Sequence, residues 1–126
     1  MIASNTLRKA FLLLALAWAG LIWYLSDQSG LDIPQAFDSQ DKALHLVAFG
    51  VLGFLVMGTQ QLPGNAFPTG SFWKVCILCA GYGVLDEYHQ SFVPGRNPDV
   101  FDVAADITGA VLGAWLLVVL LRRVLR

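Results

Sequence analysis

Four long apolar stretches alternate with short polar segments along the 126-residue chain. The apolar windows are residues 10–25, 43–59, 72–92 and 101–121. A helix needs about 20 mostly apolar residues to cross a bilayer. None of the windows shows the strict alternation of a barrel strand, and each is too long for one. The pattern therefore predicts four membrane-spanning helices.

The connections between the windows are short. Segments 60–71 and 93–100 contain prolines and glycines that end helices, and segment 26–41 carries four acids. Short connections place consecutive helices side by side and antiparallel. We therefore predict an all-α, integral membrane four-helix bundle with up-down topology, formed by residues 1–126 as a single domain.

The first window also has features of a secretory signal peptide. Arg8 and Lys9 precede it, and Ala17-Trp18-Ala19 resembles a cleavage site. The apolar run nevertheless continues to Leu25, which is longer than a typical signal core. We favour a retained helix.

Composition supports a membrane protein. The chain is 56% hydrophobic and only 13% charged, where soluble domains are roughly 25% charged. Low charge with high apolar content excludes disorder. The absence of a basic excess argues against nucleic-acid binding. A soluble domain of this size could not bury so much apolar surface.

The net charge of −1 conceals an asymmetry across the predicted topology. If both termini share one side, six bases lie there: Arg8, Lys9, Lys74, Arg122, Arg123 and Arg126. Lys42 and Arg96 lie on the other side, together with every acid: Asp27, Asp32, Asp38, Asp41, Asp86, Glu87, Asp99, Asp102 and Asp106. Because Lys and Arg of short loops stay cytoplasmic, we predict cytoplasmic N and C termini. The C-terminal arginines would anchor this topology.

Polar residues four positions apart lie toward the outer ends of three windows: Asp41 with His45, Asp86 with Gln90, and Asp102 with Asp106. Residues at this spacing share one helix face. Ionisable groups inside a membrane are costly against lipid, so they face the bundle or a water-filled cavity. We therefore expect an acidic, His-containing pocket in the outer half of the bundle.

The surplus of acids leaves two interpretations open. Unpaired acids repel one another and favour an external cation, a metal or a cationic ligand group. Alternatively, Lys42 and Arg96 neutralise some of them in a purely structural ion-pair network that locks the outer helix ends together.

Catalysis is a further alternative. His45 with Asp41 would supply a base and its orienting carboxylate, and Glu87 a general acid or base. A divalent metal held by His45, Asp86, Glu87 and Asp102 is compatible with these ligand types. The chain has neither an HExxH nor a GxSxG motif, and we predict no cofactor. An ion-coupled transporter or flippase is a less favoured class.

Three other features receive structural interpretations. Gly109 and Gly113 form a GxxxG motif, which we assign to packing within one bundle rather than to homo-oligomerisation. Cys76 and Cys79 lie in the cytoplasmic half of the third window, and we interpret them as packing residues. We interpret His89 as an interfacial polar residue rather than a ligand.

Three motifs, in this order, resemble the VanZ-like family of small bacterial membrane proteins. The first is Asp41-Lys42-x-x-His45, and the second is Asp86-Glu87-x-x-Gln90-x-Phe92-x-Pro94-Gly95-Arg96. The third is Asp102 and Asp106 followed by Gly109 and Gly113. The resemblance covers about residues 41–113, and it implies a multi-pass protein of the bacterial inner membrane.

The resemblance also implies a functional set: Asp41, Lys42, His45, Asp86, Glu87, Gln90, Arg96 and Asp102. Asp106 departs from the family pattern, where Asn is expected, and adds a negative charge. The family's namesake is associated with resistance to the glycopeptide antibiotic teicoplanin. The resemblance therefore implies work at the cell envelope and an antibiotic-resistance role.

We accordingly expect these eight residues and Asp106 to form a ligand-binding pocket on the extracytoplasmic side. Its ligand would be amphipathic: a lipid head group, a lipid-linked precursor or a glycopeptide antibiotic. Arg96 would bind a phosphate or carboxylate, and the acids would bind an amine. The first alternative is a membrane hydrolase or transferase acting on a lipid-linked substrate. Membrane lipids are the expected partners, and nucleic acid is not.

Overall fold

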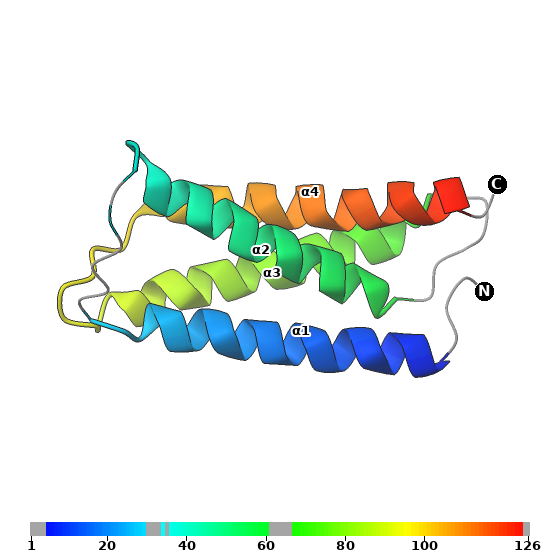
Figure 1. The fold of residues 1–126 in the computed structure, drawn as a ribbon, viewed down its shortest axis with the longest axis horizontal. Helices are drawn as coiled ribbons and strands as arrows, with labels where there is room; N and C mark the ends of the chain where they lie inside the picture. Colours follow the sequence, from blue (N-terminus) through cyan, green and yellow to red (C-terminus); the bar gives the residue numbers. More distant parts are fainter. Residues whose placement is uncertain (1–4, 30–33, 35, 61–66, 125–126) are drawn as a thin grey trace.

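The protein is a bundle of four antiparallel helices. The computed structural model describes residues 5–29, 34, 36–60 and 67–124, and within these ranges it contains helices and no strand. The helices are α1 (Asn5–Ser26), α2 (Gln40–Gly58), α3 (Thr69–Gln90) and α4 (Val100–Val124). Figure 1 shows that they run alternately up and down, so that α1 begins and α4 ends at the same end. The predicted all-α, up-down bundle is confirmed.

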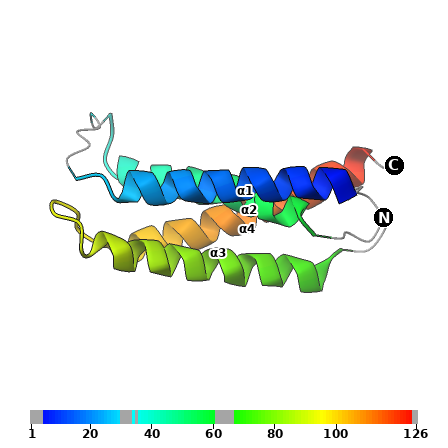
Figure 2. The ribbon, with the colours of Figure 1, turned by 90° about the horizontal axis from the view of Figure 1, so that it is seen from below.

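Three of the helices, α1, α2 and α4, are long and apolar enough to cross a membrane. α3 is not among them, although its 22 residues equal α1 in length. Its mean hydropathy is lower because it carries Lys74, Asp86 and Glu87 among apolar residues. The prediction of four spans is therefore confirmed for three helices, and α3 lies alongside the others in the same bundle (Figure 2).

The helices extend beyond most of the predicted windows. α1 begins at Asn5 and α4 reaches Val124, because helical hydrogen bonding continues through polar residues that an apolar window excludes. α3 instead ends at Gln90, two residues before the predicted boundary. After it the chain turns, with the Val93 amide donating to the carbonyl of Gln90 at 3.1 Å.

Glycines bring α2 and α4 into close contact. A Cβ added to Gly109 would collide with the carbonyl of Leu46, and one added to Gly113 with the carbonyl of Gly50. Each obstacle is backbone, which cannot rotate away as a side chain does. The GxxxG motif therefore packs within the bundle, as predicted.

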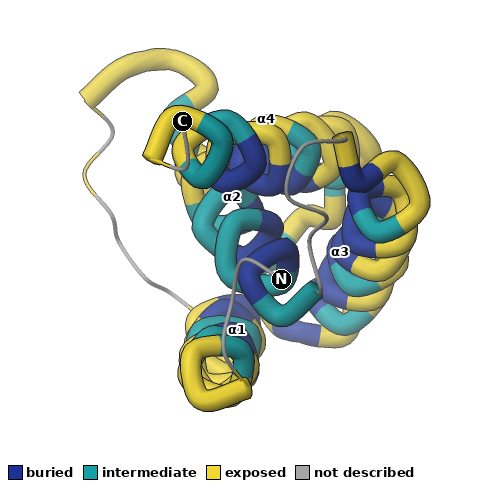
Figure 3. Tube along the Cα trace, turned by 90° about the vertical axis from the view of Figure 1, so that its right-hand side faces the viewer, coloured by how far each residue is buried: buried dark blue, intermediate teal, exposed yellow. Residues whose placement is uncertain are grey.

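The apolar core is shared by all four helices and includes Phe49, Met57, Val75, Cys79, Ala110 and Leu117. Cys76 and Cys79 are free thiols buried in this core, which confirms their packing role. α1 lies at the edge of the bundle with much of its surface exposed (Figure 3). Two hydrogen bonds to its neighbours fix its position: Trp18 Nε1 donates to the Ala48 carbonyl at 2.8 Å, and Tyr82 Oη donates to the Ala19 carbonyl at 2.6 Å.

Charges are separated along the bundle. The described bases of the terminal end are Arg8, Lys9, Lys74, Arg122 and Arg123, whereas every described acid lies at the opposite end. Asp32 and Arg126 lie outside the described residues. This separation agrees with the charge asymmetry predicted from the sequence. The placement of the termini in the cytoplasm stays a prediction.

Candidate functional site

The nine predicted ligand-binding residues lie at the end of the bundle where α2 and α4 begin and α3 ends. α2 supplies Asp41, Lys42 and His45, each within the first two turns of the helix. α3 and α4 supply the buried acids, and Arg96 belongs to the segment between these helices. The antiparallel arrangement thus brings together residues that are as many as 65 positions apart in the sequence.

His45 joins acids from two other helices. Its Nδ1 lies 2.9 Å from Oδ1 of Asp106 on α4, and its Nε2 lies 3.9 Å from Oε1 of Glu87 on α3. An ionised carboxylate only accepts, so Nδ1 donates to Asp106. We call His45, Glu87 and Asp106 the His45 cluster. The residue that orients His45 through Nδ1 is therefore Asp106, where the catalytic hypothesis had Asp41.

Lys42 binds two acids at the beginning of α4. Its Nζ lies 2.7 Å from Oδ2 of Asp99 and 3.0 Å from Oδ1 of the buried Asp102. These ion pairs agree with the structural interpretation for this residue, because the ammonium neutralises charge and joins α2 to the beginning of α4.

Sequence reasoning did not assign a role to Asp99. Its Oδ1 accepts a hydrogen bond from the Phe101 amide at 2.9 Å, which caps the N-terminus of α4, and its own amide donates to Oε2 of Glu87 at 3.0 Å. The bond from Lys42 and the bond from the Phe101 amide together hold the pKa of Asp99 below its ordinary value. An Asp directly before an apolar helical window is a typical N-cap, and that signal would have identified it.

Asp86 lies in a second polar group at the end of α3. Nε2 of Gln90 donates to Oδ2 of Asp86 at 3.0 Å and to Oγ of Ser26 at 3.3 Å. All three side chains are buried. Ser26 ends α1, and no sequence pattern had marked it, because its role depends on how α1 docks against α3.

Arg96 binds the end of α1 rather than the acids. Its Nη2 donates to the Leu25 carbonyl at 2.7 Å and its Nε donates to the Gln28 carbonyl at 3.2 Å. Carbonyls at a helix C-terminus carry partial negative charge, which a guanidinium stabilises. Among the described residues Arg96 makes no ion pair with an acid, and its contacts are with backbone carbonyls.

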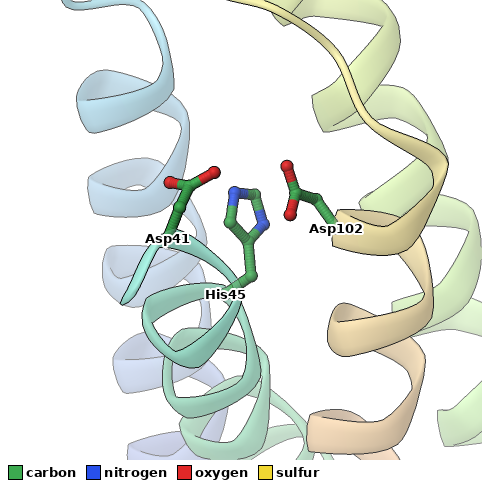
Figure 4. A group of neighbouring side chains, drawn as sticks. All are labelled: Asp41, His45 and Asp102. Carbon is green, nitrogen blue, oxygen red and sulfur yellow. The ribbon is translucent and has the colours of Figure 1, made fainter. Parts of the chain in front are cut away.

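Asp41 lies at the surface beside His45. Figure 4 shows the His45 ring between the carboxylates of Asp41 and Asp102. One ligand atom from each of these three residues lies within 4.8 Å of the other two, and the same holds for the His45 cluster. Both groups have the atom types and spacing that a metal ion requires. Asp86, a predicted metal ligand, belongs to neither group.

Three buried carboxylate oxygens have no hydrogen-bond partner among the described residues: Oδ1 of Asp86, Oε1 of Glu87 and Oδ2 of Asp106. A buried polar atom without a partner costs about 1–3 kcal/mol, and more when it is charged. Each of these oxygens can still accept a hydrogen bond or bind a cation.

A cavity of about 300 Å³ lies beside these acids, between α1, α2 and the end of α3. Its wall is apolar along α1 and α2, where it is formed by Trp18, Ile22, Leu25, Leu44, Val47, Ala48 and Phe49. Its polar residues are Ser26, Asp41, His45, Asp86, Gln90 and Arg96. Glu87, Asp102 and Asp106 are not part of the lining and lie behind it. The cavity is thus amphipathic, and five of the nine predicted ligand-binding residues line it: Asp41, His45, Asp86, Gln90 and Arg96.

His89 lies outside this cavity. Its ring stacks on Trp23 with centroids 4.1 Å apart, and its Nε2 lies 3.1 Å from Oδ1 of Asp27. These contacts join the ends of α1 and α3. They agree with the interpretation of His89 as an interfacial polar residue.

A protein-family model described as VanZ/LLP1 matches residues 11–122. The match covers α2 and α3 completely and most of α1 and α4, whereas the motif resemblance began at α2. No curated protein and no solved structure matches the chain.

Proposed function

The chain belongs to the VanZ-like family of membrane proteins, and we propose that it binds an amphipathic lipid of the cell envelope in the cavity beside α1. The polar head of this lipid carries a primary amine and a phosphate. The cavity opens on the extracytoplasmic side of the inner membrane, as the distribution of Lys and Arg favours.

The observation that carries the proposal is the composition of the cavity wall. Apolar side chains such as Trp18, Ile22 and Leu44 share one cavity with Asp41 and Asp86. An acyl chain packs against the apolar part, while an amine is attracted to the acids. A purely apolar solute would leave the buried Oδ1 of Asp86 without a partner.

The head-group chemistry follows from the charged side chains. A primary amine donates to Oδ1 of Asp86, the unpartnered oxygen of a fully buried residue that lines the cavity. Arg96 lines the same cavity and has N–H groups beyond the two that bind α1, so it suits the phosphate. Phosphatidylethanolamine has both groups. A lipid-linked precursor or a glycopeptide antibiotic is a competing ligand of related chemistry.

Native mass spectrometry of the purified protein tests the proposal. Short-chain phosphatidylethanolamine, phosphatidylcholine and phosphatidylglycerol are added separately, and the bound lipid is counted. We expect the ethanolamine lipid to bind most tightly, because the choline head cannot donate a hydrogen bond and the glycerol head has no amine. Asp86→Asn should reduce ethanolamine-lipid binding about tenfold or more, since a hydrogen bond to a charged group contributes about 1.5–3 kcal/mol.

The exposed Asp38 provides the matched control. Asp38→Asn removes the same charge at the same end of the bundle and should leave lipid binding unchanged. Equal binding of the three lipids by the wild type would overturn the proposal, as would an unchanged preference in Asp86→Asn.

Catalysis on such a lipid is the second candidate, favoured by one observation. His45 lines the cavity and its Nδ1 is fixed by Asp106, so its Nε2, when it binds no metal ion, would be available as a general base. Incubation with phosphatidylethanolamine vesicles and mass analysis of the products tests this. A product formed by the wild type and lost in His45→Gln supports catalysis, and an unchanged lipid excludes it for this substrate.

A further inference from the structure

We propose that Nε2 of His45 and Oε1 of Glu87 hold one divalent transition-metal ion between them. The ion lies on the Nε2 side of His45, at the inner edge of the lipid cavity. This site is distinct from the amine site at Asp86 and does not depend on whether a lipid binds.

The first supporting observation is the gap between His45 and Glu87. Nε2 and Oε1 are 3.9 Å apart, too far for a hydrogen bond, although no other group comes between them as a partner of Oε1. Zinc binds His nitrogen and carboxylate oxygen at about 2.0–2.2 Å, so one ion between the two atoms fits this separation. Glu87 is 6% exposed, so this gap is shielded from bulk solvent.

The second observation is the hydrogen bond on the other side of the ring. Nδ1 of His45 donates to Asp106, which is fully buried and fixes both the tautomer and the direction of the ring. Metal-ligating histidines nearly always donate their second N–H to a carboxylate or carbonyl in this way. Asp106 is therefore a positioning residue, and Nε2 is left as the metal ligand.

The third observation is the number of carboxylates around His45. Asp41 and Asp102 each place an oxygen within 4.8 Å of a His45 ring nitrogen and of each other, and they lie on either side of the ring in Figure 4, so they attract a cation to the ring without both reaching its Nε2 side. An imidazole paired with a carboxylate suits zinc or manganese better than the purely oxygen-binding calcium. His45 and Glu87 come from α2 and α3, so the ion also joins these two helices.

Charge balance gives an independent argument. Asp86, Glu87 and Asp106 are buried, and the nearby strong base Lys42 is already paired with Asp99 and Asp102. An isolated buried carboxylate is strongly destabilising unless a positive charge compensates it. A divalent ion supplies that charge at the point where Glu87 and His45 face each other.

Isothermal titration calorimetry on the full-length protein in detergent tests the site. The protein is first stripped with EDTA and then titrated with zinc or manganese chloride, with no lipid added. We expect one ion per chain. Glu87→Gln and His45→Gln should abolish this stoichiometric binding, because each removes a ligand atom.

Asp106→Asn separates positioning from ligation. It keeps an acceptor of the same shape for Nδ1 but removes the charge, so the ion should still bind with affinity reduced about 10–100-fold. His89→Gln removes the chain's other histidine and should change nothing. Thermal unfolding gives a second readout, since the ion should raise the Tm of the wild type and leave that of Glu87→Gln unchanged.

Two results would overturn the metal site: no stoichiometric uptake by the wild type, or full uptake by a folded His45→Gln protein. In either case His45 serves only to bridge Asp106 and Glu87. Native mass spectrometry in EDTA reports lipid binding separately, so failure of the metal site and failure of the lipid site remain distinguishable.

Discussion

Lys42 and His45 lie about one turn apart on α2 and meet different acids. Lys42 neutralises Asp99 and Asp102 at the beginning of α4. His45 lies one turn further into the bundle and faces Glu87 and Asp106. The outer acids are therefore balanced by the chain itself. The inner acids retain unpartnered oxygens, which is where we place the external cation.

The Lys42–Asp99 pair should resist mild acid. Folding lowers the pKa of Asp99, so its contribution to stability is present above its unfolded pKa and is lost as pH falls through the lower folded value. The Tm difference between wild type and Asp99→Asn should stay constant from pH 7 to 5 and shrink only below about pH 4. Differential scanning fluorimetry at each pH measures it.

Asn is a good substitute for this test because it caps helices as well as Asp does, so only the ion pair is removed. A Tm difference that already falls between pH 7 and pH 6 would contradict the assignment and would point to a group that titrates near neutrality.

Spacing within helices predicted much of the site. The four-residue steps correctly placed Asp41 with His45 and aligned Asp102 with Asp106 toward the interior. The partners of Arg96 and Asp99 were not predicted, because both residues belong to the segment between α3 and α4. Their partners depend on how that segment crosses the helix ends, which no helical period specifies.

At the scale of elements, α2 and α4 pack backbone against backbone, while α1 is attached at the edge. The glycines of α4 allow the first arrangement. α1 is held at the edge by hydrogen bonds that its carbonyl groups and its Trp18 side chain make. Trp18 donates to α2, Tyr82 donates to α1, and Arg96 donates to the C-terminal end of α1. The apolar windows could predict that helices exist, but not which pair lies closest.

Gly113→Ala should destabilise the bundle by about 1–3 kcal/mol, since its methyl group collides with the Gly50 carbonyl and forces the helices apart. Unfolding in mixed detergent micelles with increasing SDS measures the change. Gly81→Ala is the control, because nothing lies within 4 Å of the added carbon. It should leave stability equal or raise it by about 0.5–1 kcal/mol. Equal effects of the two variants would refute close packing at Gly113.

Tyr82→Phe tests the attachment of α1. It removes only the hydroxyl that donates to the Ala19 carbonyl at 2.6 Å, and such bonds in membrane proteins contribute about 0.6 kcal/mol on average. The same unfolding assay should show a loss of that order. Tyr24→Phe removes an exposed hydroxyl and should have no effect; a loss as large as that of Tyr82→Phe would argue against a specific link.

At the scale of the whole molecule, charge is the strongest asymmetry. Bases collect at the end that holds the termini and acids at the end that holds the site. The asymmetry could be predicted by assigning each charged residue to one end of its predicted helix. Antiparallel helices of similar length determine which of these ends lie together. The lower hydropathy of α3 is visible in the sequence, and the short connections on both sides of it were sufficient to predict that it packs beside its neighbours.

Cysteine labelling tests the membrane orientation. Asp38→Cys should react with an impermeant thiol reagent added outside intact cells, whereas Thr69→Cys should react only after permeabilisation. Both positions are exposed, and the native Cys76 and Cys79 are buried, so the wild type provides the background. The reverse labelling pattern would place the site in the cytoplasm.

The close pairing of α2 with α4 also determines when the site can form. Lys42 and Asp99 are 57 positions apart, and His45 and Asp106 are 61 apart, with the whole of α3 between them. During synthesis α4 is the last of the four helices to emerge. Until then α2 presents Lys42 and His45 without these acids, and α3 presents Glu87 without Asp99. The candidate site therefore assembles only after α4 has been synthesised, so its charged side chains are unpaired until the last helix packs against α2.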